Sequence, residues 1–316
     1  MNKLKVIQLL PELNIGGVER GTRDFSEVLV KQGHESIVIS NGGVFEKDII
    51  NNGGRHIKIP VHKKNLFSLL LSKQLKLIYE EEKPDIVHVR SRMPAWINYY
   101  AFKKLTKKPI LISTFHGLYS TPFYSQVMSK VDHTIAISNT VKKYIIDTYK
   151  VDEKNITTIP RGCDTQHFNR NEIAQEWVDA WFEEFPETKN KIILTLPTRV
   201  SKWKGLDSFI ELISKLDHTI FHGLIVGPTS SSKKRYLNSL KQKTQDLGIS
   251  KNITFTGSRN DIKNIYKISD IVFNLSIEPE PFGRTTIEAI SSGTKVIGWD
   301  HGLSLIHISE PTRLST

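Results

Sequence analysis

The sequence contains a single cysteine, Cys163, among its 316 residues. One thiol excludes an intrachain disulfide framework and a cysteine-based metal site within the chain, which fits a protein of the reducing cytosol. Long apolar runs are also missing. Residues 66–71 are far too few to span a bilayer, and the apolar run near Met1 is too short for a signal peptide. We therefore expect a cytoplasmic protein.

Carboxylates are scarce relative to cations. The chain has 44 Lys and Arg against 33 Asp and Glu, a formal net charge of +11, which favours an anionic partner. No RNP-like, zinc-finger or helix-turn-helix pattern accompanies this charge, so we do not expect nucleic acid as the partner. Lysines gather in the first half of the chain, where they either hold the protein on an anionic membrane or form an ordinary solvated face. These are Lys63, Lys64, Lys73, Lys76, Lys103, Lys104, Lys107 and Lys108.

Strand-like and helix-like patterns alternate along most of the chain. A strand over residues 5–10, a turn at Gly16 and Gly17, a helix over 18–32 and a strand over 34–40 make a βαβ opening, and the alternation restarts near residue 191. The length suffices for two domains. We expect an α/β protein with two Rossmann-like, doubly wound domains over residues 1–168 and 169–302.

The stretch over residues 277–289 is the strongest functional signal. It follows a strand over 270–276 and opens a helix after Gly283 that ends at Gly293. In an open parallel sheet, ligands bind outside the carboxyl ends of the strands, so this loop should line a ligand site.

The chemistry of this loop suits a phosphorylated sugar. Backbone N–H groups near Phe282, Gly283 and Arg284 would face an anion at the positive end of the helix dipole. Glu280 and Glu288 can accept hydrogen bonds from hydroxyls, which a sugar and a ribose supply at the two ends of one diphosphate. Taken alone, each Glu is more often an ordinary surface residue.

Two cations occupy a similar position in the chain, between a predicted strand and the helix that follows it. Arg199 follows the strand over 191–196, and Lys204 precedes the next helix. Together they would balance a diphosphate, Arg as a planar fork and Lys as a point charge. As bare charges near a loop, they would more often be solvated.

The string from 277 to 289 resembles the E-x7-E signature of the retaining, nucleotide-sugar-dependent glycosyltransferases of family 4, which have the GT-B fold. The stretch around Arg199 and Lys204 resembles the family's arginine-x4-lysine-glycine motif, with Thr198 in place of a common glycine. The resemblance implies two Rossmann-like domains that face each other across a cleft, the C-terminal one truncated here.

Weaker matches extend the resemblance into the first half of the chain. Gly16 and Gly17 match the family's glycine-rich loop under the donor diphosphate, and His116 matches a histidine that contacts the transferred sugar. Arg161 lies in a proline-x-glycine-x-aspartate stretch where many relatives have Asn; we expect it on the donor side.

The resemblance implies a retaining hexosyltransferase with a UDP-sugar as donor and a glycan or lipid-linked acceptor, in bacterial cell-envelope polysaccharide or lipopolysaccharide synthesis. Glu280, His116, Arg199 and Lys204 would be catalytic, and Glu288 would bind the ribose. No Asp-x-Asp metal clamp is present, so we expect no metal and no cofactor. The enzyme would work in the cytoplasm, on the inner face of the membrane where the acceptor is lipid-linked. The alternative is a fragment that binds a nucleotide sugar without transferring it.

Residues 303–316 break the pattern of the chain. They resemble the translation of a sequencing adapter joined to a truncated reading frame, so we interpret them as a non-native tail and expect the native protein to be longer.

Overall fold

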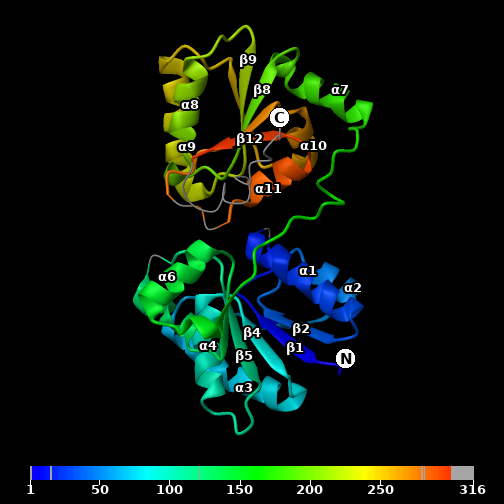
Figure 1. Cartoon of the computed structure of the whole chain (residues 1–316), viewed down its shortest axis with the longest axis vertical. Helices are drawn as coiled ribbons and strands as arrows, with labels where there is room; N and C mark the ends of the chain where they lie inside the picture. The colour runs from blue at the N-terminus through cyan, green and yellow to red at the C-terminus, as the bar shows by residue number, and fades with distance from the viewer. Residues whose placement is uncertain (1, 15, 120, 279, 281, 300–316) are drawn as a thin grey trace, which may run out of the picture. The chain divides into compact units, whose positions relative to one another are not determined.

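The computed structural model describes residues 2–14, 16–119, 121–278, 280 and 282–299. The chain divides into two compact units, Met1–Pro160 and Arg161–Thr316, each with its own sheet (Figure 1). The expected domain boundary after residue 168 therefore falls inside the second unit, where Phe168 packs against Tyr266 and Ala289. The expected non-native tail lies outside the described residues. Within those residues, no helix combines the length and apolar character needed to cross a membrane.

The first unit is built on a parallel sheet in the order β3-β2-β1-β4-β5-β6-β7. Its strands are β1 (Lys5–Leu9), β2 (Glu35–Ser40), β3 (Arg55–Lys58), β4 (Ile86–Val89), β5 (Ile110–Phe115), β6 (His133–Ala136) and β7 (Ile156–Thr158). Its helices are α1 (Gly17–Lys31), α2 (Glu46–Asn51), α3 (Leu71–Glu82), α4 (Arg92–Phe102), α5 (Pro122–Ser125) and α6 (Asn139–Tyr149), with 3₁₀ turns η1 (Leu66–Leu70), η2 (Gln126–Ser129) and η3 (Glu153–Asn155). In Figure 1, α1 and α2 cover one face of this sheet, and α3 and α4 pack together on the other.

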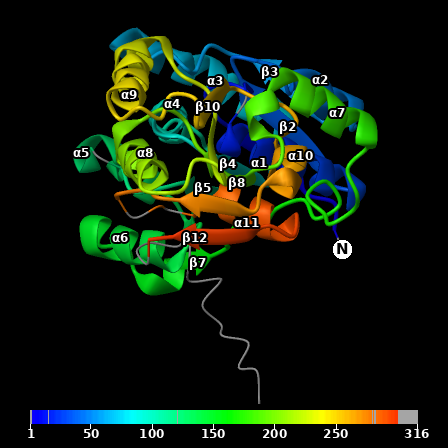
Figure 2. The ribbon, with the colours of Figure 1, turned by 90° about the horizontal axis from the view of Figure 1, so that it is seen from above.

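The second unit repeats the design with the sheet order β10-β9-β8-β11-β12, again parallel. Its strands are β8 (Ile192–Pro197), β9 (Phe221–Val226), β10 (Ile253–Gly257), β11 (Ile271–Asn274) and β12 (Lys295–Gly298). Its helices are α7 (Gln175–Glu184), α8 (Leu206–Ser214), α9 (Lys234–Asp246), α10 (Ile262–Ile268) and α11 (Arg284–Ser291), with 3₁₀ turns η4 (Pro186–Thr188), η5 (Lys202–Lys204) and η6 (Ser231–Lys233). Helices α8 and α9 lie together on one face of this sheet (Figures 1 and 2).

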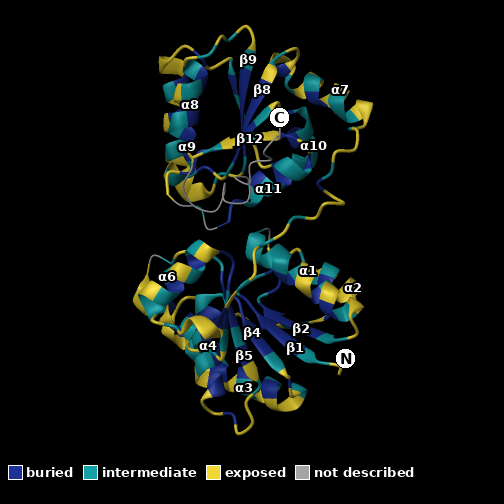
Figure 3. Cartoon of the chain, in the orientation of Figure 1, coloured by how far each residue is buried: buried dark blue, intermediate teal, exposed yellow. Residues whose placement is uncertain are grey.

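Alternate residues of β8 enter two separate cores, because successive side chains of a strand point to opposite faces. Leu194 and Leu196 join the core under α8 and α9, whereas Ile193 joins the core with Trp181 and Ile265. Most strands are accordingly dark in Figure 3, β12 being an exception, while many exposed residues lie on the helices. A sheet covered on both faces explains why its strands read as nearly continuous apolar runs.

Most of the predicted elements are confirmed within one to three residues, including the expected α/β class. Two short helices, α2 and α5, were not predicted. The apolar spacing over residues 66–82 predicts a single helix, but residues 66–70 form the separate turn η1, where the Asn65 side chain accepts a hydrogen bond from Ser68 N at 2.9 Å. That cap stabilises the start of η1, and α3 follows directly from Leu71.

Candidate functional site

The order of the second sheet places two loops beside each other. Strands β8 and β11 are neighbours, although β9 and β10 intervene along the chain, so the winding of the sheet reverses between them. Loops at such a reversal leave a crevice where ligands bind in open α/β sheets. The loops that leave β8 and β11 are residues 198–205 and 275–283, the two stretches that the sequence singled out.

Gly205 allows these loops to touch. It has φ +72°, and a Cβ built on it would lie 2.0 Å from the carbonyl oxygen of Leu275. Close to this contact, Ile277 N donates to the carbonyl oxygen of Trp203 at 2.7 Å. A side chain would therefore meet rigid backbone at Gly205, and the contact fixes Lys204 against the loop of β11.

Lys204 and Glu280 form the centre of the site. Lys204 Nζ lies 2.5 Å from Glu280 Oε1, and the side chains are only 12% and 15% exposed. Asn274 Nδ2 donates to Glu280 Oε2 at 2.9 Å, and Ser276 Oγ donates to the same oxygen at 3.2 Å. Asn274 Nδ2 also lies 3.2 Å from Thr286 Oγ1, which ties the network to the first turn of α11. The carboxylate of Glu280 is thus held from both of its oxygens.

The electrostatics of Lys204 suit a site that receives an anion. Burial lowers the pKa of Lys204 from its ordinary 10.5, the neighbouring Glu280 opposes that shift, and the positive charge of Arg199 adds to it. Arg199 is thus close enough to act on Lys204. Arg199 is exposed, and the described residues offer its guanidinium no hydrogen bond or ion pair.

Helix α11 begins at the expected place. Gly283 adopts φ +68° and precedes Arg284, the first residue of the helix, without a side-chain cap. The amides of this first turn lie at the positive end of the helix dipole, which favours a bound anion. Phe282 is 5% exposed, so its side chain belongs to the core rather than to a ligand surface.

Glu288 lies further along the same helix. It is 7% exposed, its Oε1 is 3.3 Å from Arg284 Nη2, and its Oε2 accepts from the Tyr266 hydroxyl at 3.3 Å. A nearly buried carboxylate with two partners is not the solvated surface Glu that the helix pattern alone would allow. The orientation of Glu288 is fixed from α10 as well as from α11.

The remaining predicted site residues lie elsewhere. Arg161 is half-buried at the start of the second unit, two residues before Cys163, whose Sγ lies 3.7 Å from the carbonyl oxygen of Ile287 in α11. Gly16 caps α1 and Gly17 begins it, both at the carboxyl end of β1 in the first unit. His116 directly follows β5 in the same unit and is half-buried. The structure therefore brings Glu280 and Arg199 together around Lys204, pairs Glu288 with Arg284, and places the residues of the first unit at strand ends of their own sheet.

Sequence reasoning missed the residues that orient the carboxylates, namely Asn274, Ser276, Thr286 and Tyr266. The signal for two of them was present, because polar Asn274 and Ser276 interrupt an otherwise apolar strand pattern over 270–276. A buried polar residue at the carboxyl end of such a strand requires a partner. Tyr266 gave no comparable signal, since a tyrosine in a helix is usually part of the core.

The fold is that of a GT-B glycosyltransferase. The sequence model described as Glycosyltransferase Family 4 matches residues 15–167, and the one described as Glycosyl transferases group 1 matches residues 178–306. A crystal structure of a glycosyltransferase from Rickettsia africae is 36% identical, covers 98% of this chain and is covered over 82% of its own length, with a TM-score of 0.87. The chain belongs to the family 4, group 1 glycosyltransferases.

Two curated relatives are also similar. The mannosylfructose-phosphate synthase of Agrobacterium fabrum is 30% identical over 184 residues, which make up 54% of this chain but only 38% of that protein. The UDP-Gal:alpha-D-GlcNAc-diphosphoundecaprenol alpha-1,3-galactosyltransferase of Escherichia coli is 25% identical over 327 residues, covering 94% of this chain and 79% of the relative.

Proposed function

We propose that this glycosyltransferase is a retaining, metal-independent enzyme that moves a hexose-type sugar from a UDP-sugar to a glycan or lipid-linked acceptor. The observation that carries the proposal is the Lys204–Glu280 pair, held by Asn274 and Ser276 beside the N-terminus of α11. It combines an anion-binding helix end and a buried cation with a carboxylate that can receive sugar hydroxyls.

Each charged group has a role in this proposal. The diphosphate lies against the first turn of α11, with Arg199 and Lys204 opposing its charge. Glu280 accepts a hydrogen bond from a hydroxyl of the transferred sugar, and Glu288 accepts one from the ribose. From the first unit, His116 contacts the sugar and Gly16 and Gly17 approach the diphosphate.

The reaction then needs no nucleophile from the protein. The acceptor hydroxyl attacks the anomeric carbon from the face that the diphosphate leaves, the bond from that carbon to the phosphate oxygen breaks, and the phosphate takes the hydroxyl proton. Positive charge placed in advance where negative charge grows is worth several kcal/mol in such steps, on the order of 3–4 for one donor. Arg199, Lys204 and the α11 amides supply that charge.

The Escherichia coli relative supports the donor and acceptor classes, because its name specifies UDP-galactose and a lipid-linked sugar. We infer the same two classes here, with cell-envelope polysaccharide or lipopolysaccharide as the product. A lipid-linked acceptor would place the enzyme on the inner face of the cytoplasmic membrane.

A panel of UDP-, GDP- and ADP-sugars tests this proposal, with binding read by thermal shift and transfer read on polyprenyl-diphosphate-sugar acceptors. We expect Glu280→Gln and Glu288→Gln to reduce transfer at least a hundredfold. Glu278→Gln, a change of the same kind at an exposed neighbour, should leave it intact. Wild-type transfer by Glu280→Gln or Glu288→Gln would refute the assignment. Donor binding without transfer by the wild type would instead identify a binding-only chain.

A further inference from the structure

An apolar groove lies on the first unit beside α4. It has a volume of about 390 Å³ and lies between η1, α4 and the residue Tyr124 of α5. Its walls are mostly carbon. They are formed by Lys64, Asn65, Leu66, Leu69, Met93, Trp96, Tyr100 and Tyr124.

Large apolar side chains project into solvent from the elements that form this groove. Leu66 is 82% exposed, Phe67 80% and Leu70 64%, all in η1, and Phe123 beside Tyr124 is 87% exposed. Single exposed apolar residues are common, but several on adjoining elements mark an interaction surface. The Asn65 cap stabilises the start of η1, so the exposed side chains of η1 do not belong to a frayed helix end.

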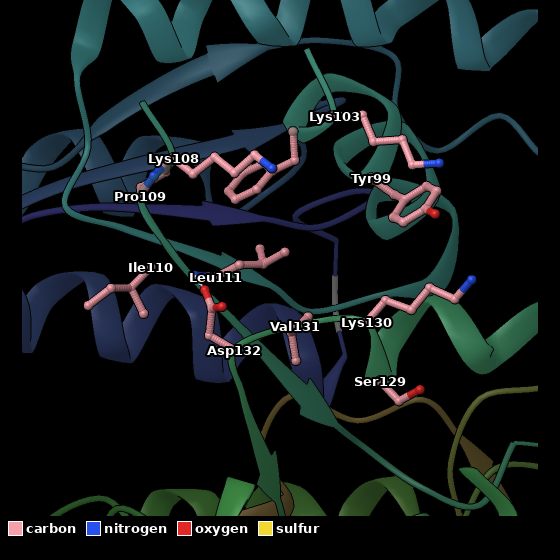
Figure 4. Close-up of a pocket in the computed structure, with 11 residues that line it drawn as sticks. Tyr99, Lys103, Lys108, Pro109, Ile110, Leu111, Ser129, Lys130, Val131 and Asp132 are labelled. Carbon is pink, nitrogen blue, oxygen red and sulfur yellow. Dashed lines mark hydrogen bonds between the residues drawn. The ribbon is translucent and has the colours of Figure 1, made fainter. Parts of the chain in front are cut away.

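A row of aromatic rings connects the groove to a basic cavity. Trp96 stacks on Tyr100 with ring centroids 6.2 Å apart, and Tyr99 lies 5.8 Å from Trp96 and 5.5 Å from Tyr100. Tyr99 lines the cavity shown in Figure 4, which has a volume of about 620 Å³. Lys103 Nζ and Lys130 Nζ lie 4.6 and 5.2 Å from the centroid of the Tyr99 ring. Aromatic rings beside lysines are typical of the boundary between water and hydrocarbon.

The elements that form these features carry mostly positive charge. Residues 49–79, which include η1, carry six Lys and Arg and no Asp or Glu, and residues 86–131, which include α4 and α5, carry seven and none. The cavity is also lined by Asp132, but its Oδ2 accepts a hydrogen bond from Leu111 N at 2.8 Å and so faces the backbone. An occupant of this surface must therefore be apolar in part and anionic in part.

We propose that the groove, the aromatic row and the basic cavity, here called the α4 surface, dock the protein on an anionic lipid bilayer. Phe67, Leu66 and Phe123 enter the acyl region, and the lysines contact lipid phosphates. A second copy of the chain does not fit, because a twofold contact would bring two cation-rich faces together. Nucleic acid would satisfy the charge but leave the apolar side chains in water. The proposal goes beyond the transfer reaction and does not depend on its donor or acceptor.

Vesicle flotation of the full chain tests the apolar part. We expect binding to phosphatidylcholine vesicles that contain roughly one quarter phosphatidylglycerol, and little binding to phosphatidylcholine alone. The pair Phe67→Ser with Phe123→Ser should weaken binding about tenfold or more, since each ring loses its place in hydrocarbon. The matched pair Val44→Ser with Ile50→Ser, at apolar residues 59% and 52% exposed in the same unit, should bind like the wild type.

A second pair of variants tests the charge. Lys103→Gln with Lys130→Gln should weaken binding about tenfold or more, because each lysine near an anionic surface contributes about a fivefold factor. The control Lys31→Gln with Lys154→Gln removes two exposed lysines elsewhere in the unit and should have little effect.

Three results would overturn the proposal. The first is flotation of either double variant at the level of the wild type, and the second is equal binding of the wild type to neutral and anionic vesicles. The third is a wild type that binds no vesicles but self-associates or retains duplex DNA, with either property lost in the double variants. Transfer to a short, water-soluble acceptor serves as the parallel readout. It should survive in all of these variants, so failure of docking and failure of the proposed reaction are separable.

Discussion

Replacement of Gly205 by alanine isolates the contact that builds the site. The backbone has φ +72° there, so an alanine would cost about 1–2 kcal/mol for its left-handed conformation alone. Its Cβ would also lie 2.0 Å from the carbonyl oxygen of Leu275, and forcing an atom into packed structure adds about 1–3 kcal/mol. We expect Gly205→Ala to lower the free energy of unfolding of the second unit by about 2–5 kcal/mol in total.

Gly248 provides a matched control. It has φ +70°, but nothing lies within 4 Å of a Cβ built on it. Gly248→Ala should therefore show the conformational cost without the steric one, about 1–2 kcal/mol. The difference between the two variants measures the contact between the loops of β8 and β11.

Urea unfolding followed by tryptophan fluorescence suits this comparison, because Trp177, Trp181 and Trp203 all report on the second unit. UDP affinity is the second readout. A shifted Gly205 moves Lys204 away from Glu280, so UDP should bind Gly205→Ala about tenfold or more weakly and Gly248→Ala normally. Equal losses of stability and normal UDP binding in both variants would refute the role given to Gly205.

Two further predictions concern the centre of the site. Asn274→Ala removes a 2.9 Å donor from Glu280 Oε2, a loss worth about 1.5–3 kcal/mol for a charged acceptor; kcat/KM should fall about 10- to 150-fold, and an unchanged value would show that Asn274 does not position Glu280. Burial lowers the pKa of Lys204, so the ammonium loses its proton as pH rises through a value below the ordinary 10.5, and UDP affinity should fall with it. Lys204→Arg should flatten that fall on the alkaline side, because guanidinium stays protonated; parallel curves for the two proteins in calorimetric titrations would contradict this.

The sequence predicted the elements of the fold because each carries its own local pattern. The strand over 270–276, the turn at Gly283 and the end at Gly293 were all confirmed, with φ +68° and +90° at the two glycines. Those conformations are ones that only glycine adopts readily, so the residue type alone carried the information. The short helices α2 and α5 could not be predicted from a local pattern, because a helix of one or two turns has too few residues to show a hydrophobic period.

The organisation of the site could not be predicted in the same way. Lys204 and Glu280 are 76 positions apart, and nothing in either stretch shows that they meet. Sequence reasoning assigned them separate roles, Lys204 toward phosphate and Glu280 toward a sugar hydroxyl. The structure shows that they are partners, because β8 and β11 are neighbours in the sheet. Contacts between distant segments depend on the strand order, which local patterns do not encode.

This pairing changes how the charge of the site should be counted. Lys204 is matched by Glu280, and Arg284 by Glu288, so both cations are already neutralised before any anion arrives. Arg199 and Lys202 are the basic residues of the two loops for which the described residues show no ion pair. A diphosphate that binds here then gains net attraction from Arg199, Lys202 and the amides at the start of α11, while Lys204 opposes its charge from the place where Glu280 holds it. The two carboxylates then keep a fixed orientation toward hydroxyls because a cation holds each one in place.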